Sequence, residues 1–373
     1  MSGRGYQISL LSVEKSNNFE KRADLIEDIT RQNKISWHYI TYTKKPPVVS
    51  TLYDLRRLIQ KVKKLHQAQS FDFFHCRSYI SALVGLYFKK NHRVPFIFDM
   101  RGFWADERVD GGLWNLKNPV FHRVYRYFKK KEKEFLKEAA YTISLTHKAK
   151  EEMESWAVPG MSPVQVIPCC VDTDLFREGK VLEVPFEDAP RIAYLGSIGT
   201  WYMLEEMLLF FKQLQGFYPK AHFNFITTEA PEKILAPAQK IGLKPASFTI
   251  SRAERKEVPQ RLAENHLSIF FIKPLFSKMA SSATKMGEIL AMGLPVIANR
   301  QVGDHEYLFE KYACGLMVDL KDNPRSNAQA FDKLIPTIPA LLKVPASERR
   351  QVALEYFSLA EGVAHYQKVY EAI

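Results

Sequence analysis

A lysine and a glutamate stand three residues apart in a segment that is otherwise apolar enough to be buried. In TKMGEILAMGLPVIAN, residues 284–299, these are Lys285 and Glu288. Long charged side chains are rarely buried unless they are paired or bind something. A carboxylate here can accept both hydroxyls of a cis-diol such as ribose, and an ammonium can face a diphosphate. The alternative is a surface pair, worth only about 0.2–0.5 kcal/mol.

The residues before this pair predict where it lies in a fold. LSIFFIKP reads as a buried strand, LFSKMASSA as the loop at its carboxyl end, and a helix begins near Thr284. We expect Ser281 or Ser282 to cap that helix. Its free backbone N–H groups suit a phosphate.

A second candidate loop carries two glycines. RIAYLGSIGTWYMLEEMLLFF predicts a strand, a turn containing Gly196, Ser197 and Gly199, and then a helix from residue 201. Glycines leave backbone N–H groups accessible at a helix N-terminus, where an anion is favoured. A phosphate site and a plain tight turn remain equally open. The spacing is not the GxGxxG fingerprint of a dinucleotide fold, and the chain has no GxxxxGK[ST] loop.

A third group of polar residues follows the apolar run VPFIFDM. Arg101, Trp104, Asp106 and Glu107 combine both charges with an indole, and two glycines come soon after. This composition suits a sugar-binding loop in which the indole stacks on a pyranose. A surface loop with internal salt bridges is the alternative.

The strand FDFFHC, one βα unit earlier, ends beside two further candidates, His75 and Arg77. His75 suits a base or a sugar ligand, and a hydrogen-bonded structural histidine is the alternative. Asp99 is a candidate for burial against Arg101.

Short apolar runs alternate with helical patterns along the whole chain, which is typical of βα units with parallel sheets. The remaining strands expected in the first half are QISLLS, SWHYITY, AYTISL and VQVIPCC, and helices are expected over 20–33, 51–69, 78–90 and 121–138. In the second half the strands are RIAYLGS, HFNFITT, ASFTI, LSIFFI, LPVIAN and CGLMVD, with helices over 201–215, 231–241, 257–265, 284–292 and in the tail. The acid- and proline-containing stretch 171–190 is expected to be the linker. We therefore predict an α/β fold of two Rossmann-like, doubly wound domains, 1–172 and 190–355, that face a ligand cleft.

The chain of 373 residues carries a formal charge of +12, which attracts anionic partners. The densest basic cluster, residues 122–140, has apolar residues at helical spacing. It predicts an amphipathic helix with a solvated face, or with a face resting on an anionic membrane. Nucleic acid is not expected, since no RNA-binding signature accompanies the charge. No apolar run approaches the ~20 residues that span a bilayer, and the polar N-terminus is unlike a signal peptide, so we expect a cytoplasmic protein. The four cysteines lack CxxC spacing and predict neither zinc nor disulfides.

Two segments resemble the family 4 retaining glycosyltransferases. GEILAMGLPVIAN is similar to the family's E-x4-G-x-P-V segment, and VQVIPCCVDTDLF resembles its IPNGVDxxxF. The matching positions are Glu288, Gly293, Pro295 and Val296 in the first segment and Val171, Asp172 and Phe176 in the second. YLGSIGTW also stands where the family opens its second domain, so the resemblance runs over nearly the whole chain.

The resemblance implies the GT-B fold, with the tail helix, about 356–373, crossing back to the first domain. It implies that the first domain binds an acceptor and the second a nucleotide-diphosphate sugar. By analogy Glu288 binds the donor ribose, and amides near Ser281 to Thr284 hold the diphosphate. No metal, cofactor or catalytic nucleophile is implied, because in the mechanism usually proposed the departing phosphate helps to deprotonate the acceptor.

The sequence departs from the family pattern at three places. Ala280 stands eight residues before Glu288, where many members have an acid that contacts the sugar. GSIGTWY lacks the Arg and Lys that many members use against the diphosphate, so Lys285, Lys273 and Lys278 are expected to replace them. Arg101 stands where a histidine near the sugar is common.

The predicted function is therefore a retaining glycosyltransferase that moves a sugar from a nucleotide-diphosphate donor to a glycan, a lipid-linked molecule or another acceptor. Synthesis of cell-surface polysaccharides or glycoconjugates is the expected context, with the enzyme in the cytoplasm or peripheral on the inner membrane face. Arg101 and His75 are the candidate catalytic residues. The alternatives are a nucleotide-sugar 2-epimerase on the same fold and a non-catalytic nucleotide-sugar-binding protein.

Overall fold

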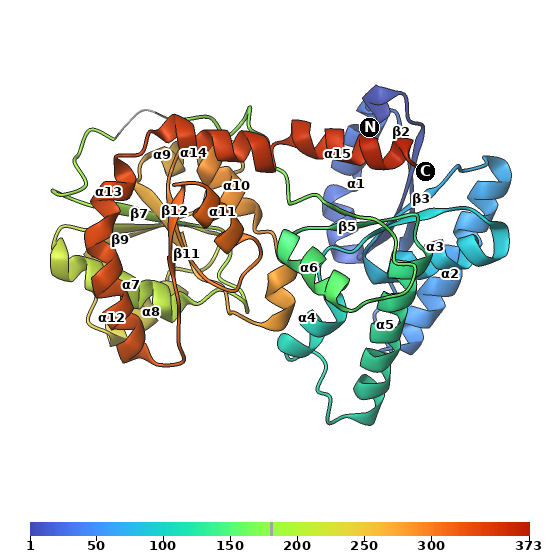
Figure 1. Ribbon diagram of the computed structural model, residues 1–373, viewed down its shortest axis with the longest axis horizontal. Helices are drawn as coiled ribbons and strands as arrows, with labels where there is room; N and C mark the ends of the chain where they lie inside the picture. The colour runs from blue at the N-terminus through green and yellow to red at the C-terminus, as the bar shows by residue number, and fades with distance from the viewer. Residues whose placement is uncertain (180–181) are drawn as a thin grey trace.

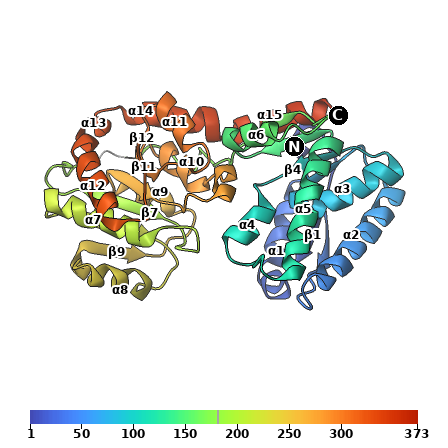
Figure 2. The same ribbon diagram turned by 60° about the horizontal axis from the view of Figure 1, so that its bottom comes forward.

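The computed structural model describes residues 1–179 and 182–373, which form two units of parallel strands and covering helices. Figure 1 and Figure 2 show the units side by side, with α15 (Leu359–Glu371) leading from the second back to the first. The predicted α/β fold of two parallel-sheet domains is confirmed. Two residues of the predicted linker 171–190, 180 and 181, lie outside the described part of the chain.

The first unit contains a two-stranded sheet, β1-β2, and a four-stranded sheet of order β3-β4-β5-β6, all parallel. Its strands are β1 (Ile8–Glu14), β2 (Ile35–Thr41), β3 (Phe74–Arg77), β4 (Phe96–Asp99), β5 (Tyr141–Ser144) and β6 (Val164–Val166). Its helices are η1 (Ser2–Arg4), α1 (Ser16–Gln32), α2 (Val49–Ala68), α3 (Ser78–His92), α4 (Trp104–Asp110), α5 (Pro119–Glu138) and α6 (His147–Ser155). All six strands coincide with predicted ones, whereas α4 and α6 were not predicted.

The four-stranded sheet is covered on both faces. On one face Phe98 packs against Tyr79 of α3 and Phe135 of α5, with ring centroids 5.4 and 5.1 Å apart. On the other face Val369 of α15 joins a buried cluster with Ile97 and other sheet residues. The predicted return of the tail helix to the first domain is therefore confirmed.

The second unit is a six-stranded parallel sheet of order β12-β11-β10-β7-β8-β9. The strands are β7 (Arg191–Leu195), β8 (His222–Ile226), β9 (Phe248–Ser251), β10 (Leu267–Phe270), β11 (Val296–Asn299) and β12 (Gly315–Val318). The helical segments are α7 (Leu204–Phe217), α8 (Glu232–Lys240), η2 (Pro245–Ser247), α9 (Val258–Ala263), η3 (Phe276–Ala280), α10 (Thr284–Ala291), α11 (His305–Lys311), α12 (Pro324–Leu334), η4 (Ile335–Thr337), α13 (Ile338–Leu342), α14 (Ala346–Val352) and the π-turn Ala353–Phe357. The strand order reverses between β7 and β10, and doubly wound sheets bind ligands at such a switch point.

The chain crosses between the units at two adjacent segments. The backbone N–H of Val171 donates to the carbonyl of Phe357 at 2.7 Å, and Val171 pairs with Ser358. Gly287 of α10 packs directly on this crossing, because a Cβ on Gly287 would lie 2.9 Å from both Phe357 and Val171. The position of α10 is thereby fixed to the crossing between the units.

We expect Gly287→Ala to destabilise the protein by about 1–3 kcal/mol, because the added methyl overpacks backbone-anchored core residues. Gly216→Ala is the matched control, since it is an exposed glycine in α7 with open space around its Cβ position. The control is expected to be neutral or stabilising by up to about 1 kcal/mol. Urea denaturation measures both, and equal effects of the two substitutions would show that Gly287 is not a tight contact.

Candidate active site

Lys285 and Glu288 lie on α10, which follows η3 and the switch-point strand β10. Both side chains are almost fully buried, with only 8% of Lys285 and 7% of Glu288 exposed. They are therefore not the solvated surface pair that was the alternative to a binding site. Each faces different neighbours.

The ammonium of Lys285 is surrounded by aromatic rings. Its Nζ lies 3.7 Å from the ring centroid of Tyr202, 4.2 Å from that of Tyr194 and 5.5 Å from that of Phe270. Within the described part of the chain, this Nζ has no hydrogen-bond partner. Rings attract the cation through their faces but accept none of its three N–H bonds conventionally.

Burial lowers the pKa of Lys285 to about 7, and the attraction of Glu288 only partly opposes this effect. Burial of the amine therefore outweighs the attraction of Glu288 and disfavours the ammonium relative to water. An anion beside Nζ would supply the missing hydrogen bonds and restore the charged form. Gly196, which follows β7, lets the lysine approach the backbone closely, because a Cβ on it would lie 3.3 Å from Lys285 Nζ.

The loop that contains Gly196, Ser197 and Gly199 does not lead directly into a helix at residue 201, as the sequence predicts. Helix α7 begins at Leu204 and not at residue 201, because Tyr202 pairs with Ile272 beyond β10 and Met203 N–H donates to Phe271. Gly196 and Gly199 therefore lie upstream of the helix N-terminus. The N–H of Gly196 is already used by the carbonyl of Ile226, at 2.9 Å.

The remaining residues of this loop are held by local contacts. The carbonyl of Ser197 accepts from the Tyr194 hydroxyl at 2.8 Å, and Ile198 N–H donates to the carboxylate of Glu229 at 3.2 Å. Gly199 is exposed, and a Cβ there would meet nothing within 4 Å. The loop thus shapes the wall around Lys285, and Gly196, at φ +106°, makes its tight exit from β7.

The predicted serine cap of α10 is wrong. The N-cap residue is Ala283, and no side chain caps the helix. The Ser282 hydroxyl instead accepts the backbone N–H of Cys169 at 3.0 Å, across the domain interface. Ser281 is half-buried and Thr284 is exposed at the start of the helix. Ser282 does not cap α10 because its hydroxyl instead accepts a hydrogen bond from a backbone N–H of the first domain.

Glu288 is paired with a residue that the sequence analysis missed. Arg255, on the loop after β9, places its Nη1 2.7 Å from Glu288 Oε1. The guanidinium also lies 5.1 Å from the ring of Phe176, which belongs to the crossing segment. No periodicity or motif links Arg255 to Glu288, so only the fold could reveal this contact.

Lys278 and Lys273, the other expected diphosphate ligands, do not join Lys285. Lys278 is buried, forms a 2.7 Å ion pair with Glu107 of the first domain and lies 3.6 Å from the ring of Trp201. Lys273 is exposed, and its backbone N–H donates to the carbonyl of Trp201. Lys278 therefore bridges the two domains through its ion pair with Glu107, whose side chain is 41% exposed.

Two of the predicted sugar contacts are also placed elsewhere. Trp104 packs into the first-domain core, where its ring centroid lies 4.9 Å from that of Phe128. Asp106 is buried and accepts from Tyr125 and Lys129, each at 2.8 Å. The stretch is the amphipathic helix α4, whose inner face packs on α5, and the sugar contacts expected of these two side chains stay predictions.

At the sheet edge of the first domain, His75 is already hydrogen-bonded on both ring nitrogens. Nδ1 lies 2.7 Å from the Tyr370 hydroxyl of α15, and Nε2 lies 3.3 Å from Asp99 Oδ2. The other oxygen of Asp99, Oδ1, is buried without a hydrogen-bond partner among the described residues. Arg77 ends β3 exposed to solvent.

Arg101 lies at φ +59°, and its guanidinium nitrogen Nη2 is 3.3 Å from Cys169 Sγ. Although burial alone would lower it, the pKa of Arg101 is raised by Cys169 and Asp99. The contact is between the end of β4 and the crossing segment. Arg101 therefore stays charged next to the segment of the chain that crosses between the two domains.

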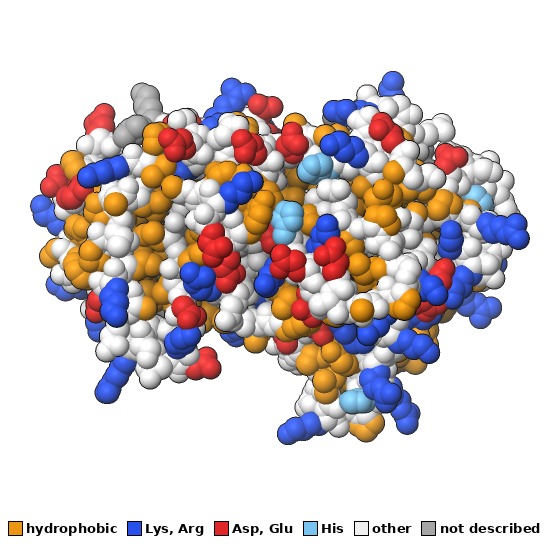
Figure 3. All heavy atoms as spheres, viewed as in Figure 1, with side chains coloured by type: hydrophobic (Ala, Val, Ile, Leu, Met, Phe, Trp, Pro, Cys, Tyr) orange, Lys and Arg blue, Asp and Glu red, His pale blue; other side chains and the backbone are white. Residues whose placement is uncertain are grey.

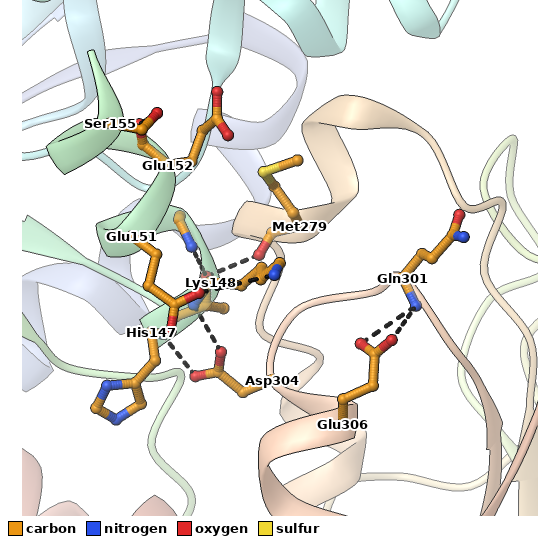
Figure 4. Close-up of polar contacts among 11 residues, drawn as sticks. His147, Lys148, Glu151, Glu152, Ser155, Met279, Gln301, Asp304 and Glu306 are labelled. Carbon is orange, nitrogen blue, oxygen red and sulfur yellow. Dashed lines mark hydrogen bonds and ion pairs between the residues drawn. The ribbon is translucent and has the colours of Figure 1, made fainter.

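The domains are also joined at the start of α6. Figure 4 shows the carboxylate of Asp304, from the second domain, facing the backbone N–H groups of His147 at 2.8 Å and Lys148 at 3.1 Å. Beside it, the Thr146 hydroxyl donates to the carbonyl of Met279 at 2.7 Å. A carboxylate at a helix N-terminus is favoured by the helix dipole. The second domain thus caps a helix of the first.

Comparisons with known proteins agree with this architecture. Residues 1–175 match the model of Glycosyltransferase Family 4, which confirms the predicted resemblance on that part of the chain. No curated protein matches the chain.

The full fold resembles solved GT-B glycosyltransferases. One is sucrose-phosphate synthase from Thermosynechococcus elongatus, with 16% identity, coverage of 98% of each chain and a TM-score of 0.68. Another is Anabaena HepE solved with UDP, with 12% identity, 99% and 100% coverage and a TM-score of 0.66. A third is a glycosyltransferase from Rickettsia africae, with 15% identity, 98% coverage of each chain and a TM-score of 0.64. The predicted GT-B fold is confirmed.

We expect Lys285→Met to raise the melting temperature of the ligand-free protein at pH 6 by about 2–4 °C, because it removes a buried ammonium without hydrogen bonds. The folded pKa is about 7 and the ordinary value 10.5, so the cost of the charge is full below pH 7. The gain should therefore shrink as the pH rises from 7 toward 10.

Differential scanning calorimetry over this pH range measures the effect. Lys240→Met is the control, because Lys240 is exposed at the end of α8 and should change little at any pH. A Lys285→Met protein less stable than the parent at pH 6 would contradict this view of the site.

Proposed function

We propose that this protein is a retaining glycosyltransferase that uses a nucleotide-diphosphate sugar held by the second domain. The buried ammonium of Lys285, which has no hydrogen-bond partner among the described residues and lies one turn from Glu288, is the observation that carries the proposal. It lies where the strand order reverses, beside Gly196. A diphosphate there supplies the missing acceptors, and Glu288 accepts the ribose hydroxyls next to it.

Two further observations support a sugar-nucleotide donor. The first domain matches a glycosyltransferase family, and the fold is that of HepE, which was solved with UDP-glucose. UDP-sugars are therefore the first donors to test. HepE shares only 14% identity with this chain, so the resemblance supports the fold and leaves the sugar to experiment.

In the proposed reaction the bond between the sugar C1 and the β-phosphate oxygen breaks, while a bond from C1 to the acceptor oxygen forms on the same face. The acceptor proton passes to the departing phosphate. Lys285 stabilises the negative charge that develops on this phosphate, and its low-dielectric surroundings strengthen that effect. The remaining task of the chain is to position both substrates.

We expect Glu288→Ala to abolish the rise in melting temperature that the true donor causes in the parent protein, because ligands that bind only the native state stabilise it. A panel of UDP-, GDP-, ADP- and TDP-sugars identifies that donor. Glu310→Ala, an exposed residue of α11, is the control and should keep the full shift. An unchanged shift in Glu288→Ala would contradict the donor site.

Proton NMR of the donor without acceptor then separates the three candidate activities. Slow release of sugar with its anomeric configuration retained supports the transferase. Conversion to a second nucleotide sugar shows an epimerase, and binding without turnover shows a non-catalytic protein. Ala280, in place of the acid of many relatives, makes the last outcome worth testing.

The acceptor that we propose is lipid-linked and lies on an anionic membrane, which α5 approaches through its basic face. Lys130, Lys131, Lys133 and Lys137 line a groove of about 890 Å³ together with Glu134, Glu138 and apolar residues that include Trp156 and Pro159. Lysine charges beside apolar residues suit an anionic amphiphile.

Two neighbouring lysines that were expected to present free charge on this face are paired with carboxylates, although Lys131 also lines the groove. Lys129 pairs with Asp106 and Glu132, and Lys131 pairs with Glu134 at 2.7 Å. The basic face is therefore narrower than the sequence predicts.

The N-terminal end of α5 protrudes from the molecule. Leu113 and Val120 are 60% and 54% exposed just before and within the first turn of α5. Figure 3 shows hydrophobic and basic side chains together on the protrusion at the lower edge of the molecule, where Figure 1 places the start of α5. Among the described residues, no helix has the length and apolarity of a membrane span.

We expect the triple variant K130E/K133E/K137E to bind phosphatidylglycerol vesicles roughly 100-fold more weakly, since each basic residue near an anionic surface is worth about 1 kcal/mol. Vesicle sedimentation measures binding against neutral phosphatidylcholine vesicles. The control K212E/K220E/K244E makes the same charge change on exposed residues of the second domain. Equal losses in the two variants would rule out a specific face, as would equal binding to both lipids.

A further inference from the structure

Arg255 is the one cation that contacts the buried carboxylate of Glu288 through a hydrogen bond in the described part of the chain. It lies on the loop that follows β9, 33 residues before its partner. Nothing in the chemistry attributed to Lys285 requires it. Its position raises the question of what a cation does beside Glu288, the carboxylate that we propose binds the donor ribose.

The burial of the two partners is unequal. The side chain of Arg255 is 58% exposed, whereas that of Glu288 is 9% exposed. The exposed side chain of Arg255 thus extends inward to contact the buried carboxylate of Glu288. The contact joins one nitrogen, Nη1, to one oxygen, Oε1, at 2.7 Å. Such a charge-assisted hydrogen bond fixes the orientation of the Glu288 carboxylate. The other oxygen of this carboxylate, Oε2, takes no part in the bond.

The arginine is itself held in place. Its guanidinium lies 5.1 Å from the ring centroid of Phe176, which is completely buried. Its loop is tied by the backbone N–H of Glu254, which donates to the Glu257 carboxylate at 2.8 Å. A planar guanidinium packed against a ring loses little further freedom when it bonds a carboxylate. Arg255 is therefore a prearranged partner.

Lys285 cannot take over this role. It lies one turn from Glu288, but its ammonium is directed into the cage of Tyr194 and Tyr202. A guanidinium remains charged at every physiological pH. Arg255, and not Lys285, is therefore the residue that can hold the Glu288 carboxylate in a fixed direction toward ligand hydroxyls.

We propose that Arg255 is a positioning residue for the donor ribose: it holds Glu288 by Oε1 so that Oε2 meets the ribose hydroxyls, and it thereby sets the preference for ribonucleotides over deoxyribonucleotides. The inference rests on the proposed donor site. It adds a residue from a different loop, whose effect on ligands passes through Glu288.

Isothermal titration calorimetry with UDP, GDP and ADP and with their 2′-deoxy forms tests the inference. The parent protein is expected to bind its preferred ribonucleotide at least about tenfold more tightly than the deoxy form, since a buried carboxylate left without its hydroxyl is penalised. In Arg255→Met the affinity for the ribonucleotide should fall about tenfold and the preference should nearly vanish. Arg255→Lys should restore part of the preference.

Two further variants separate positioning from general damage. Arg252→Met alters the same loop, but Arg252 contacts the carbonyl of Thr228 and not Glu288, so the preference should stay as in the parent. In a double-mutant cycle, Arg255→Met should have little effect once Glu288→Gln is present, because both act through one interaction. Circular dichroism and melting temperatures check that each variant is folded.

The outcomes distinguish this inference from the proposed function. If the parent prefers ribonucleotides and Arg255→Met keeps the same preference, the positioning role is wrong and the donor site stands. Tighter ribonucleotide binding by Arg255→Met also overturns it, because the arginine would then compete with the ribose. If the parent binds no nucleoside diphosphate, or binds both forms equally, the donor site fails and the inference fails with it.

Discussion

A buried ammonium without a hydrogen-bond partner is the constraint on which this structure depends. Lys285 is enclosed by residues from β7, from β10 and from the loop that the Tyr202–Ile272 bridge folds over the sheet end. These elements meet only because the strand order reverses between β7 and β10. The ligand-free protein therefore holds a buried lysine whose charged form a diphosphate would favour. Such prearranged charge stabilises a leaving group without reorganisation during the reaction.

Several polar contacts join the two domains. Lys278 reaches Glu107, Ser277 N–H donates to Asp110 at 3.0 Å, and Asp304 caps α6. A polar network of this kind fixes one arrangement of the two domains, because each buried partner would be left unsatisfied by another arrangement.

The sequence predicts what depends on local pattern and fails where a distant partner decides. The strands and α10 follow from apolar runs and their spacing, and the place of Lys285 and Glu288 follows from the loop before them. Helix α4 was missed because its charged residues read as a loop, yet Asp106 turns inward to Lys129. Ser282 did not cap α10 because Cys169 N–H competes for it. Arg255 carries no local signal at all, since its contact with Glu288 exists only after β9 and α10 are brought together.

The central claim, that the Lys285 ammonium awaits a diphosphate, is tested most directly by a pH titration of its ¹³Cε resonance in lysine-labelled protein. Lys285→Arg, which lacks this resonance, assigns the signal. The account predicts a titration midpoint near 7 without ligand, as burial dictates, and a rise of about 1–3 pH units with a saturating nucleoside diphosphate. A midpoint near 10.5 in the free protein, or one that a saturating nucleoside diphosphate leaves unchanged, would contradict it.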